Sequence, residues 1–455
     1  MKKKLYIQTY GCQMNQYDSE RIAQVMAREG YDRTDRIDAA DLILLNTCSV
    51  RDKAEHKVYS ALGSWKEFKN YRDGVIIGVG GCVAQQEGER LLRRAPHLDL
   101  VFGTHNIHKL PQMIGQVQAA HLRPVETAFY RDPAYMEDAD GRTQVQGAKA
   151  FVTVMQGCNK VCSFCIVPHV RGREVSRPSA KIIAEVEALV ARGVIEVMFL
   201  GQNVNSYGKL TPGELTFAEL LRRADAIDGL ERIRFTTSHP QDLSPELTEA
   251  FADLTHLCEH LHLPVQSGSD AVLARMRRGY TREEYLERLR RLRGRRPEVA
   301  LSTDIIVGFP GETDAEFEAT LEMLEQVEYD EIYSFIYSPR PQTVSAKIYD
   351  DDISADLKKE RLEKVQALQK AISLKKNRQR IGDLEEVLID GPSKLKSGQV
   401  MGRTRGNRIV NVNGPDSLIG RLAPVRITGA TATSLIGELL WDKPMASSQV
   451  QGENA

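Results

Sequence analysis

The chain has 455 residues and a formal net charge of −1, so it is long enough for about three domains and carries no overall attraction to nucleic acid. Its 42% hydrophobic and 27% charged residues are typical of a globular protein and exclude wholesale disorder. The longest apolar runs are strand-sized, below the ~18 residues of a membrane span. The lysine-rich start is not followed by the apolar stretch of a signal peptide. We therefore expect a cytoplasmic protein with no membrane partner.

The first third of the chain alternates short apolar strands with amphipathic helices. We expect strands at Leu5–Thr9, Asp41–Asn46 and Val75–Val79, and helices at Ser19–Glu29, Lys53–Leu62 and Glu87–Arg94. This alternation predicts an α/β domain with a doubly wound parallel sheet. We place the domain at residues 1–120 and a polar linker at 121–146.

The middle of the chain repeats a strand–helix unit. We expect six strands, at Phe151–Gln156, Ile195–Leu200, Arg232–Thr237, His260–Val265, Leu301–Phe309 and Glu331–Tyr337. Helical patterns such as Ser179–Ala191 and Thr313–Val327 separate them. Six consecutive units predict a partial TIM-type (β/α) barrel, short of the full eight. With part of the charged helix expected at Ala355–Arg380, this domain spans residues 147–378.

The C-terminal region is rich in glycine and has a β pattern from Leu384 to Trp441. Expected turns at Asp390-Gly391-Pro392 and Asn413-Gly414-Pro415 favour a small five-stranded β-barrel at residues 379–442. We expect residues 443–455 to form a flexible tail. A modest local excess of Lys and Arg permits a polyanionic partner, although an ordinary solvated surface explains it equally well.

Three of the seven cysteines form a C-x3-C-x2-C pattern at Cys158, Cys162 and Cys165. In a reducing compartment, cysteines serve metal binding, catalysis or burial rather than disulfides. Zinc needs four ligands, and no fourth ligand stands at a matching spacing. Three thiolates on a short loop suit a [4Fe–4S] cluster with one open iron. The loop follows the first barrel strand, where such barrels place active sites. Phe164 could shield the cluster or simply pack.

The N-terminal cysteines share a topological position. Cys12, Cys48 and Cys82 each follow the carboxyl end of an expected parallel strand. Such ends meet at one edge of a doubly wound sheet, where ligands bind. The sequence therefore suggests a second three-cysteine cluster, the alternative being three unrelated buried thiols. We expect Cys258 to be a buried thiol and His105 and His108 to be surface residues.

The segment FVTVMQGCNKVCSFCIVPHVRG resembles the signature of radical S-adenosylmethionine enzymes. Further segments extend the resemblance to the methylthiotransferase family. Around the N-terminal cysteines these are YGCQMNQYDSE, NTCSVRDKAEHKV and GCVAQ, and later in the chain they are RGREVSRP, LGQNVNSYG, TTSHP, HLPVQSGS, LSTDIIVGFPGET and YSPRP. The resemblance covers Tyr6 to about Trp441. One departure is the segment Arg340–Val344, RPQTV, where the family often shows RPGTP; the changed residues put the local backbone in doubt.

The resemblance implies a chemistry for the two cysteine sets. The cluster on Cys158, Cys162 and Cys165 would bind S-adenosylmethionine and generate a radical from it. The cluster on the N-terminal cysteines would hold the sulfur that reaches the product, and a further S-adenosylmethionine would supply the methyl group. A one-electron donor such as flavodoxin or ferredoxin is implied. The sequence does not indicate the sulfur donor, and we expect a monomer.

The implied substrate is tRNA, modified at C2 of N6-dimethylallyl(isopentenyl)adenosine beside the anticodon. TTSHP and GREVSRP favour this branch of the family. Relatives with the same chemistry act on threonylcarbamoyl-adenosine or on an aspartate of a ribosomal protein. A further alternative, from another functional class, is an iron–sulfur redox sensor that binds RNA without catalysis.

Several other residues are candidates for ligand contacts. Gln202 and Asn203 follow the second barrel strand, where related enzymes bind the amino group of the cofactor; a plain strand-end turn is the alternative. Asp304, within a strand, could hydrogen-bond the cofactor or pair with a buried neighbour. Two groups of basic side chains could contact RNA phosphates. The first follows the cluster loop and consists of Arg171, Arg173 and Arg177. The second lies in a C-terminal segment that resembles the RNA-binding TRAM domain and consists of Arg403, Arg405 and Arg408. Surface solvation and a purely structural C-terminal cap are the alternatives.

Overall fold

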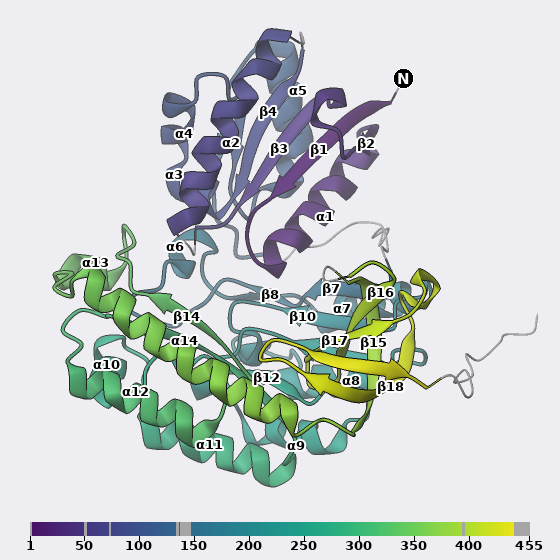
Figure 1. Ribbon diagram of the computed structural model, residues 1–455. Helices are drawn as coiled ribbons and strands as arrows, with labels where there is room; N and C mark the ends of the chain where they lie inside the picture. The colour runs from purple at the N-terminus through teal and green to yellow at the C-terminus, as the bar shows by residue number, and fades with distance from the viewer. Residues whose placement is uncertain are drawn as a thin grey trace, which may run out of the picture.

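The structure is a computed structural model that describes residues 2–49, 52–71, 74–132, 136, 147–393 and 396–440. An N-terminal α/β unit stands above a (β/α) barrel, and a small β-barrel packs beside the latter (Figure 1). The predicted tail at 443–455 and half of the predicted linker lie outside the described residues. Within the described part of the chain, no helix is both long enough and apolar enough to cross a membrane.

The N-terminal unit is built on a six-stranded parallel sheet. Its order is β2-β1-β3-β4-β5-β6, formed by β1 (Lys3–Thr9), β2 (Tyr31–Arg33), β3 (Leu42–Thr47), β4 (Ile76–Gly81), β5 (Leu100–Phe102) and β6 (Val125–Glu126). Apolar side chains of α1 (Gln13–Arg28) and α5 (Leu110–Ala120) pack on one face, and those of α2 (Asp52–Tyr71), α3 (Cys82–Glu87) and α4 (Glu89–Arg94) on the other. The prediction of a doubly wound sheet is confirmed.

Helix α1 begins earlier than predicted, helix α3 was not predicted, and a cysteine stands at the start of each. Helix α1 has Cys12 as its N-cap, and α3 begins at Cys82 directly after β4. Cys12 and Asn15 cap α1 reciprocally, the Cys12 amide donating to Asn15 Oδ1 at 3.4 Å. Cysteine is not a usual N-cap residue, so the ordinary helix-start signal was missing at α1; the N-cap of α3 is Gly81.

The middle unit is a partial barrel of six parallel strands. Strands β7, β10 and β11 form one sheet, β12, β13 and β14 form another, and a bridge between Ile233 and Leu257 joins them. The strands are β7 (Lys149–Thr153), β10 (Glu196–Leu200), β11 (Arg232–Phe235), β12 (His260–His262), β13 (Ala300–Val307) and β14 (Glu331–Ile336). A short antiparallel pair, β8 (Met155–Gln156) with β9 (Val175–Ser176), flanks the cysteine loop. The six-unit prediction is confirmed.

Amphipathic helices cover the outside of this barrel. Their apolar faces and the outward-facing strand residues form the largest core of the protein. The helices are α7 (Ser179–Val190), α8 (Phe217–Asp225), α9 (Pro245–Asp253), α11 (Arg282–Arg295), α12 (Asp314–Val327) and α14 (Ala355–Arg378), with the shorter α6 (Val167–Val170), α10 (Asp270–Arg275) and α13 (Val344–Ile348). The charged helix α14 buries only a narrow stripe, which includes Val365 and Ile372.

The C-terminal unit is a closed five-stranded barrel. Its order is β15-β16-β17-β19-β18, from β15 (Leu384–Pro392), β16 (Gln399–Thr404), β17 (Ile409–Asn413), β18 (Leu422–Ala430) and β19 (Leu435–Leu439). The turn after Asn413 lies where predicted. The turn predicted at Asp390-Gly391-Pro392 is wrong: β15 runs through these residues, with a register shift between Ile389 and Gly391. Aspartate and glycine are residue types that occur in β-bulges as well as in turns.

The departure at Gln342 has a backbone consequence. Gln342 adopts φ = 75°, a left-handed conformation that glycine takes at much lower cost than other residues. The neighbouring Thr343 accounts for the fixed turn, because its side chain and amide both donate to the Arg340 carbonyl, at 2.8 and 3.2 Å. The turn therefore keeps a shape suited to glycine without having one.

The loop Thr404–Arg408 of the small barrel packs against the amino-terminal end of the large one. Arg234 on β11 donates to the carbonyls of Thr404 and Arg405 at 2.8 and 2.9 Å. Arg232, also on β11 and fully buried, donates to the Arg403 carbonyl at 2.9 Å and pairs with Glu386 at 2.8 Å. The loop therefore supplies acceptors that two buried barrel arginines need.

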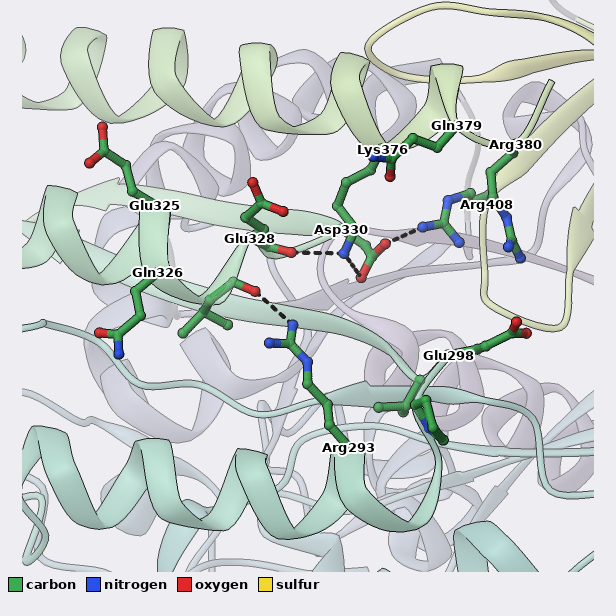
Figure 2. A pocket seen from close by; sticks show the side chains of 13 residues that line it. Arg293, Glu298, Glu325, Gln326, Glu328, Asp330, Lys376, Gln379, Arg380 and Arg408 are labelled. Carbon is green, nitrogen blue, oxygen red and sulfur yellow. Dashed lines mark hydrogen bonds and ion pairs between the residues drawn. The ribbon is translucent and has the colours of Figure 1, made fainter.

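The arginines of this loop also point into the domain interface. Arg405 pairs with Glu259 at 2.9 Å and donates to the Thr255 and Leu257 carbonyls, each at 2.9 Å. Arg408 pairs with Asp330, which also binds Lys376 of α14 (Figure 2). Arg403 bonds within its own loop, to the Asn407 carbonyl at 2.9 Å. The prediction that these three arginines contact RNA phosphates is therefore corrected for Arg405 and Arg408, which bind the two barrels together.

Replacing Arg405 should weaken this interface. Arg405→Gln removes an ion pair and two hydrogen bonds to carbonyls, and we expect it to lower the free energy of unfolding by about 2–3 kcal/mol. Arg421→Gln, at an exposed arginine of the same barrel, should stay within about 0.5 kcal/mol of the parent. Urea unfolding followed by circular dichroism measures both. Equal stability of the two variants would contradict the docking role.

Candidate functional site

The three N-terminal cysteines follow three adjacent parallel strands, as predicted. Cys12 follows β1, Cys48 follows β3 and Cys82 follows β4, and these strands are neighbours in the sheet. Successive strands are added on one side of β1 up to β2 and on its other side from β3 onward, which makes this edge the switch point at which doubly wound sheets bind ligands. Cys12 is exposed, and Cys48 and Cys82 are buried.

Two glycines allow the cysteine loops to approach one another. A side chain at Gly11 would place its Cβ 2.8 Å from the Cβ of Cys48. Gly81 has φ = 90°, and a Cβ there would lie 2.4 Å from the Thr47 carbonyl oxygen. Asn15 completes the contact, because its Nδ2 donates to the Thr47 carbonyl at 2.9 Å. The β1, β3 and β4 ends are thus held together by close backbone contact and a buried amide.

The thiols at this edge interact electrostatically. A hydrogen bond with Cys48 lowers the pKa of Cys12 to about 6; burial opposes this shift, and the positive charge of Arg171 adds to it. Burial raises the pKa of Cys82, and the charge of Arg171 partly offsets that rise. Metal ligation needs thiolates, and this edge already contains a cation beside two of them.

The second cysteine set lies on the loop between β8 and α6, at the carboxyl end of the barrel. Burial raises the pKa of Cys158 to about 11 and of Cys165 to about 12, and each also feels the charge of Cys162. The Ser163 hydroxyl fixes the loop by donating to the Arg275 carbonyl at 2.8 Å. These thiols lie near one another, and their burial disfavours free thiolates. Binding of the three sulfurs to a metal centre would offset this cost.

Arg278 is the buried cation beside this loop. Its Nη1 donates to the Cys162 sulfur at 3.2 Å, and its Nη2 donates to the Pro264 carbonyl at 2.7 Å. Its Nε bonds the Tyr280 hydroxyl at 2.9 Å. His239 Nε2 lies 4.0 Å from the same sulfur. Sequence reasoning did not single out Arg278, because RMRRGYTREE contains four arginines that the pattern does not distinguish.

Polar atoms without a partner stand next to this loop. The Ser238 hydroxyl and Gln266 Oε1 are buried and have no hydrogen-bond partner among the described residues. Thr237 and Gln266, which follow β11 and β12, adopt φ values of 69° and 78°. Strained backbone and unpaired buried acceptors concentrate where ligands bind. TTSHP and HLPVQSGS contain these residues, so motif matching reached them without assigning individual roles.

The predicted cofactor contacts have different environments. Gln202 Oε1 accepts from the Gly157 amide at 2.5 Å and so supports the cysteine loop. Asn203 is fully buried, with its amide bound to Asp242 at 2.7 Å and to the His239 amide at 3.0 Å. Asp304 lies 3.6 Å from His262. Phe164 packs against an apolar cluster that includes Phe309. Contact of any of the four with a cofactor stays a prediction.

Two of the arginines after the cysteine loop are buried, contrary to the prediction that they contact RNA. Arg171 is 3% exposed and pairs with Asp18 at 2.7 Å. Arg177 is 4% exposed and pairs with Glu185 at 2.7 Å. The predicted RNA contact of both is corrected, because neither guanidinium reaches the surface. Arg173 is exposed, and its RNA contact stays a prediction.

The carboxyl edge of the N-terminal sheet faces the carboxyl end of the barrel. Met14 and Tyr17 of α1 pack against Leu200 of β10, and Cys82 packs against Ile166 and Val170 around α6. Figure 1 shows α6 directly below α3. The two cysteine sets therefore lie on facing edges of neighbouring domains. His105, predicted at the surface, is instead buried in this contact; Cys258 is buried and His108 exposed, as predicted.

The chemistry of the two cysteine sets differs from that of a site for one metal ion. Among the described residues, no three His, Cys, Asp or Glu side chains are placed to hold a single metal ion. In a four-iron cluster each cysteine binds a different iron, so its ligands stand further apart than those of one ion. Each set fits such a cluster, because it has three thiols, no fourth ligand among the described residues and a buried arginine beside it. The unpaired acceptors near the barrel set fit a small polar cofactor.

Three family models match the chain. They are the uncharacterized protein family UPF0004 over residues 4–103, the radical SAM superfamily over 152–324 and the TRAM domain over 378–440. The first two matches include the two cysteine sets, one in each. The third covers the small barrel.

Curated relatives match almost the full length. A tRNA-2-methylthio-N(6)-dimethylallyladenosine synthase of Geobacter metallireducens is 55% identical over 96% of this chain and 98% of its own. The synthase of the same name from Geobacter sulfurreducens is 53% identical, over 97% and 98% of the two chains. The chain belongs to this synthase family. A member from Aeromonas hydrophila subsp. hydrophila is 48% identical, over 97% of this chain and 92% of its own.

Solved structures share the fold at low sequence identity. The radical S-adenosylmethionine methyltransferase TsrM from Kitasatospora setae, with cobalamin and a [4Fe-4S] cluster bound, is 14% identical with a TM-score of 0.57, over 86% of this chain and 82% of its own. The cobalamin-dependent radical enzyme OxsB has a TM-score of 0.51 at 14% identity, over 81% and 56% of the two chains. The synthase family thus shares its α/β architecture with cobalamin-binding radical enzymes.

Proposed function

We propose that this enzyme is a tRNA methylthiotransferase, which adds a methylthio group to C2 of N6-dimethylallyladenosine beside the anticodon. The observation that carries the proposal is the pairing of two three-cysteine sets on facing domain edges, in a chain of the synthase family. When bound, a four-iron cluster with S-adenosylmethionine supplies a 5′-deoxyadenosyl radical and a methyl group. A radical route suits the reaction, because the C2–H bond of a purine is not acidic enough for base catalysis.

The barrel residues have separate parts in this proposal. Cys158, Cys162 and Cys165 hold the radical-forming cluster, and Arg278 offsets the charge of their thiolates. Gln202 fixes the loop that bears them through the Gly157 amide. The unpaired oxygens of Ser238 and Gln266 are placed to accept hydrogen bonds from the cofactor or the target nucleoside. The N-terminal edge packs over this end of the barrel.

A second cluster on Cys12, Cys48 and Cys82 is the finer part of the proposal. Its support is the meeting of three strand ends, the close approach at Gly11 and Gly81 and the cation beside the thiols. In this arrangement the sulfur donor site belongs to the N-terminal domain and the radical site to the barrel. The domain boundaries predicted above, at residues 120, 146, 378 and 442, stay proposals.

Iron content tests the two clusters. Protein reconstituted without oxygen should bind about eight irons, from two four-iron clusters. Changing Cys158, Cys162 and Cys165 together to Ala should halve that content and abolish cleavage of S-adenosylmethionine. Iron near four in the parent protein, unaltered by this change, would contradict the proposal of two clusters.

The N-terminal set should be separable from radical formation. A Cys12→Ala, Cys48→Ala, Cys82→Ala variant should still cleave S-adenosylmethionine reductively, because the barrel cluster is intact, but should form no methylthio product. Mass spectrometry of tRNA nucleosides measures the product. The same measurement, with a digest of ribosomal proteins, tests the alternatives of threonylcarbamoyl-adenosine and an aspartate side chain. Ordinary tRNA modification by the variant would rule out sulfur delivery from this site.

The partners remain proposals. We infer a one-electron donor such as flavodoxin or ferredoxin, a monomeric enzyme and a cytoplasmic location. For tRNA, the exposed cations of the small barrel, Lys396, Arg421 and Arg426, replace the arginines that dock the two barrels. Arg173, exposed after the cysteine loop, is the corresponding candidate on the large barrel.

These exposed cations should contribute to tRNA affinity through phosphates. Changing Lys396, Arg421 and Arg426 to Gln should weaken tRNA binding, and the slope of log affinity against log salt should fall by about one for each phosphate that is no longer neutralised. Binding across a salt series measures this. Cleavage of S-adenosylmethionine without RNA is the control and should not change. An unaltered slope would place the phosphate contacts outside the small barrel.

A further inference from the structure

The segment directly after the third barrel cysteine joins the two cysteine-bearing domains. Ile166 and Val170 of this segment pack against Cys82. The Thr104 hydroxyl donates to the Val170 carbonyl at 2.8 Å, and His105 Nε2 lies 2.9 Å from the Arg171 carbonyl. The backbone at Arg171 is therefore held by the loop after β5 of the N-terminal domain.

The bond from His105 has a defined direction. Its Nδ1 accepts from the Tyr130 amide at 3.1 Å, so Nε2 carries the proton and donates to Arg171. Burial lowers the pKa of His105 to about 4, which keeps the ring neutral near pH 7. The contact therefore positions Arg171 without adding a second positive charge.

The Arg171 side chain crosses into the N-terminal domain. It pairs with Asp18, which lies six residues beyond the Cys12 cap of α1 and is itself 4% exposed. Nη2 of Arg171 faces the Asp18 carboxylate at 2.7 Å, and Nη1, which is also buried, has no hydrogen-bond partner among the described residues. The guanidinium faces the side chain of Cys82, and its charge also acts on Cys12. Guanidinium donors are thus available at the N-terminal cysteines.

A cluster on these cysteines would place negative charge in a buried site. Three thiolates carry more negative charge than the oxidised cluster core offsets, and reduction adds another electron. Burial penalises that charge unless a cation or hydrogen-bond donors stand close by. The reduction potential of an iron–sulfur cluster depends on net charge and on hydrogen bonds to its sulfurs. Arg171 offers both effects at this edge.

We propose that Arg171, which belongs to the radical-forming domain, is a positioning residue for the cluster on Cys12, Cys48 and Cys82. Its guanidinium donates to sulfur of that cluster and favours the reduced state, and Asp18 holds the guanidinium in place. The inference rests on the proposed second cluster. A merely structural ion pair between the domains would fix their contact but would not set the potential in a charge-dependent way.

The two partners of the ion pair should shift the potential in opposite directions. Arg171→Gln removes a positive charge, so the midpoint potential should become more negative. Asp18→Asn removes a negative charge while keeping the shape of the side chain, so the potential should become more positive. Arg171→Lys keeps the charge and should restore the potential in part, since an ammonium group lacks the planar fork of a guanidinium.

The measurement uses the full-length protein with Cys158, Cys162 and Cys165 changed to Ala, so that only the N-terminal cluster titrates. Reductive titration followed by electron paramagnetic resonance gives the midpoint potential, and iron analysis gives the occupancy. Arg177→Gln is the matched control: it removes an equally buried, ion-paired arginine of the same segment and should leave the potential unchanged.

The outcomes separate this inference from the function it rests on. Full iron occupancy with unchanged potentials in Arg171→Gln and Asp18→Asn, or shifts of the same sign in both, would overturn the role of Arg171. If Arg171→Gln fails to fold, the direction of the shift in Asp18→Asn decides the question alone. Absence of bound iron from the parent background would overturn the second cluster itself.

Discussion

Parallel strands all end at the same edge of a sheet, and in this protein two such edges face each other. The loops after β1, β3 and β4 carry one cysteine set, and the loop after β8 carries the other. Neither set is close in sequence to the other, and only the stacking of the domains through α1, α3 and α6 brings them to one interface. Strand polarity therefore determines where both sites lie, and the domain contact determines that they lie together.

Each cysteine set has one buried arginine that comes from elsewhere in the chain. Arg278 follows α10 and donates to Cys162. Arg171 follows α6 and reaches the N-terminal edge beside Asp18. Burying a guanidinium is unfavourable unless it meets negative charge or acceptors, so its presence beside buried thiols is informative. The two sites resemble each other in this balance of charge, although their folds differ.

Much of the architecture follows from sequence patterns, because strand and helix periods are strong signals. The six barrel strands, the doubly wound sheet and the convergence of Cys12, Cys48 and Cys82 were all predictable. The start of α1 was not, because a cysteine occupies its cap position, and α3, which is capped by Gly81, was not predicted. The residues 390–392 were predicted as a turn because a bulge and a turn share the same residue types.

The environment of the arginines was the main feature that the sequence did not reveal. An arginine in a polar loop has the same local pattern whether it faces solvent, RNA or another domain. Arg405 and Arg408 bind the barrel, and Arg171 and Arg177 are buried. Their partners, such as Glu259 and Asp330, are distant in sequence, so only the tertiary structure identifies them.

The contact between the loop Thr404–Arg408 and the large barrel bears on how independent the C-terminal domain is. Arg232 and Arg234 are core-facing residues of the barrel, yet their acceptors belong to a segment synthesised about 170 residues later. Until that segment emerges from the ribosome, these two guanidinium groups lack their carbonyl acceptors and keep the carboxylate of Glu196 beside them. The small barrel is therefore not a detachable module. An exchange of this domain with that of a relative should therefore keep the docking loop matched to the two arginines of β11.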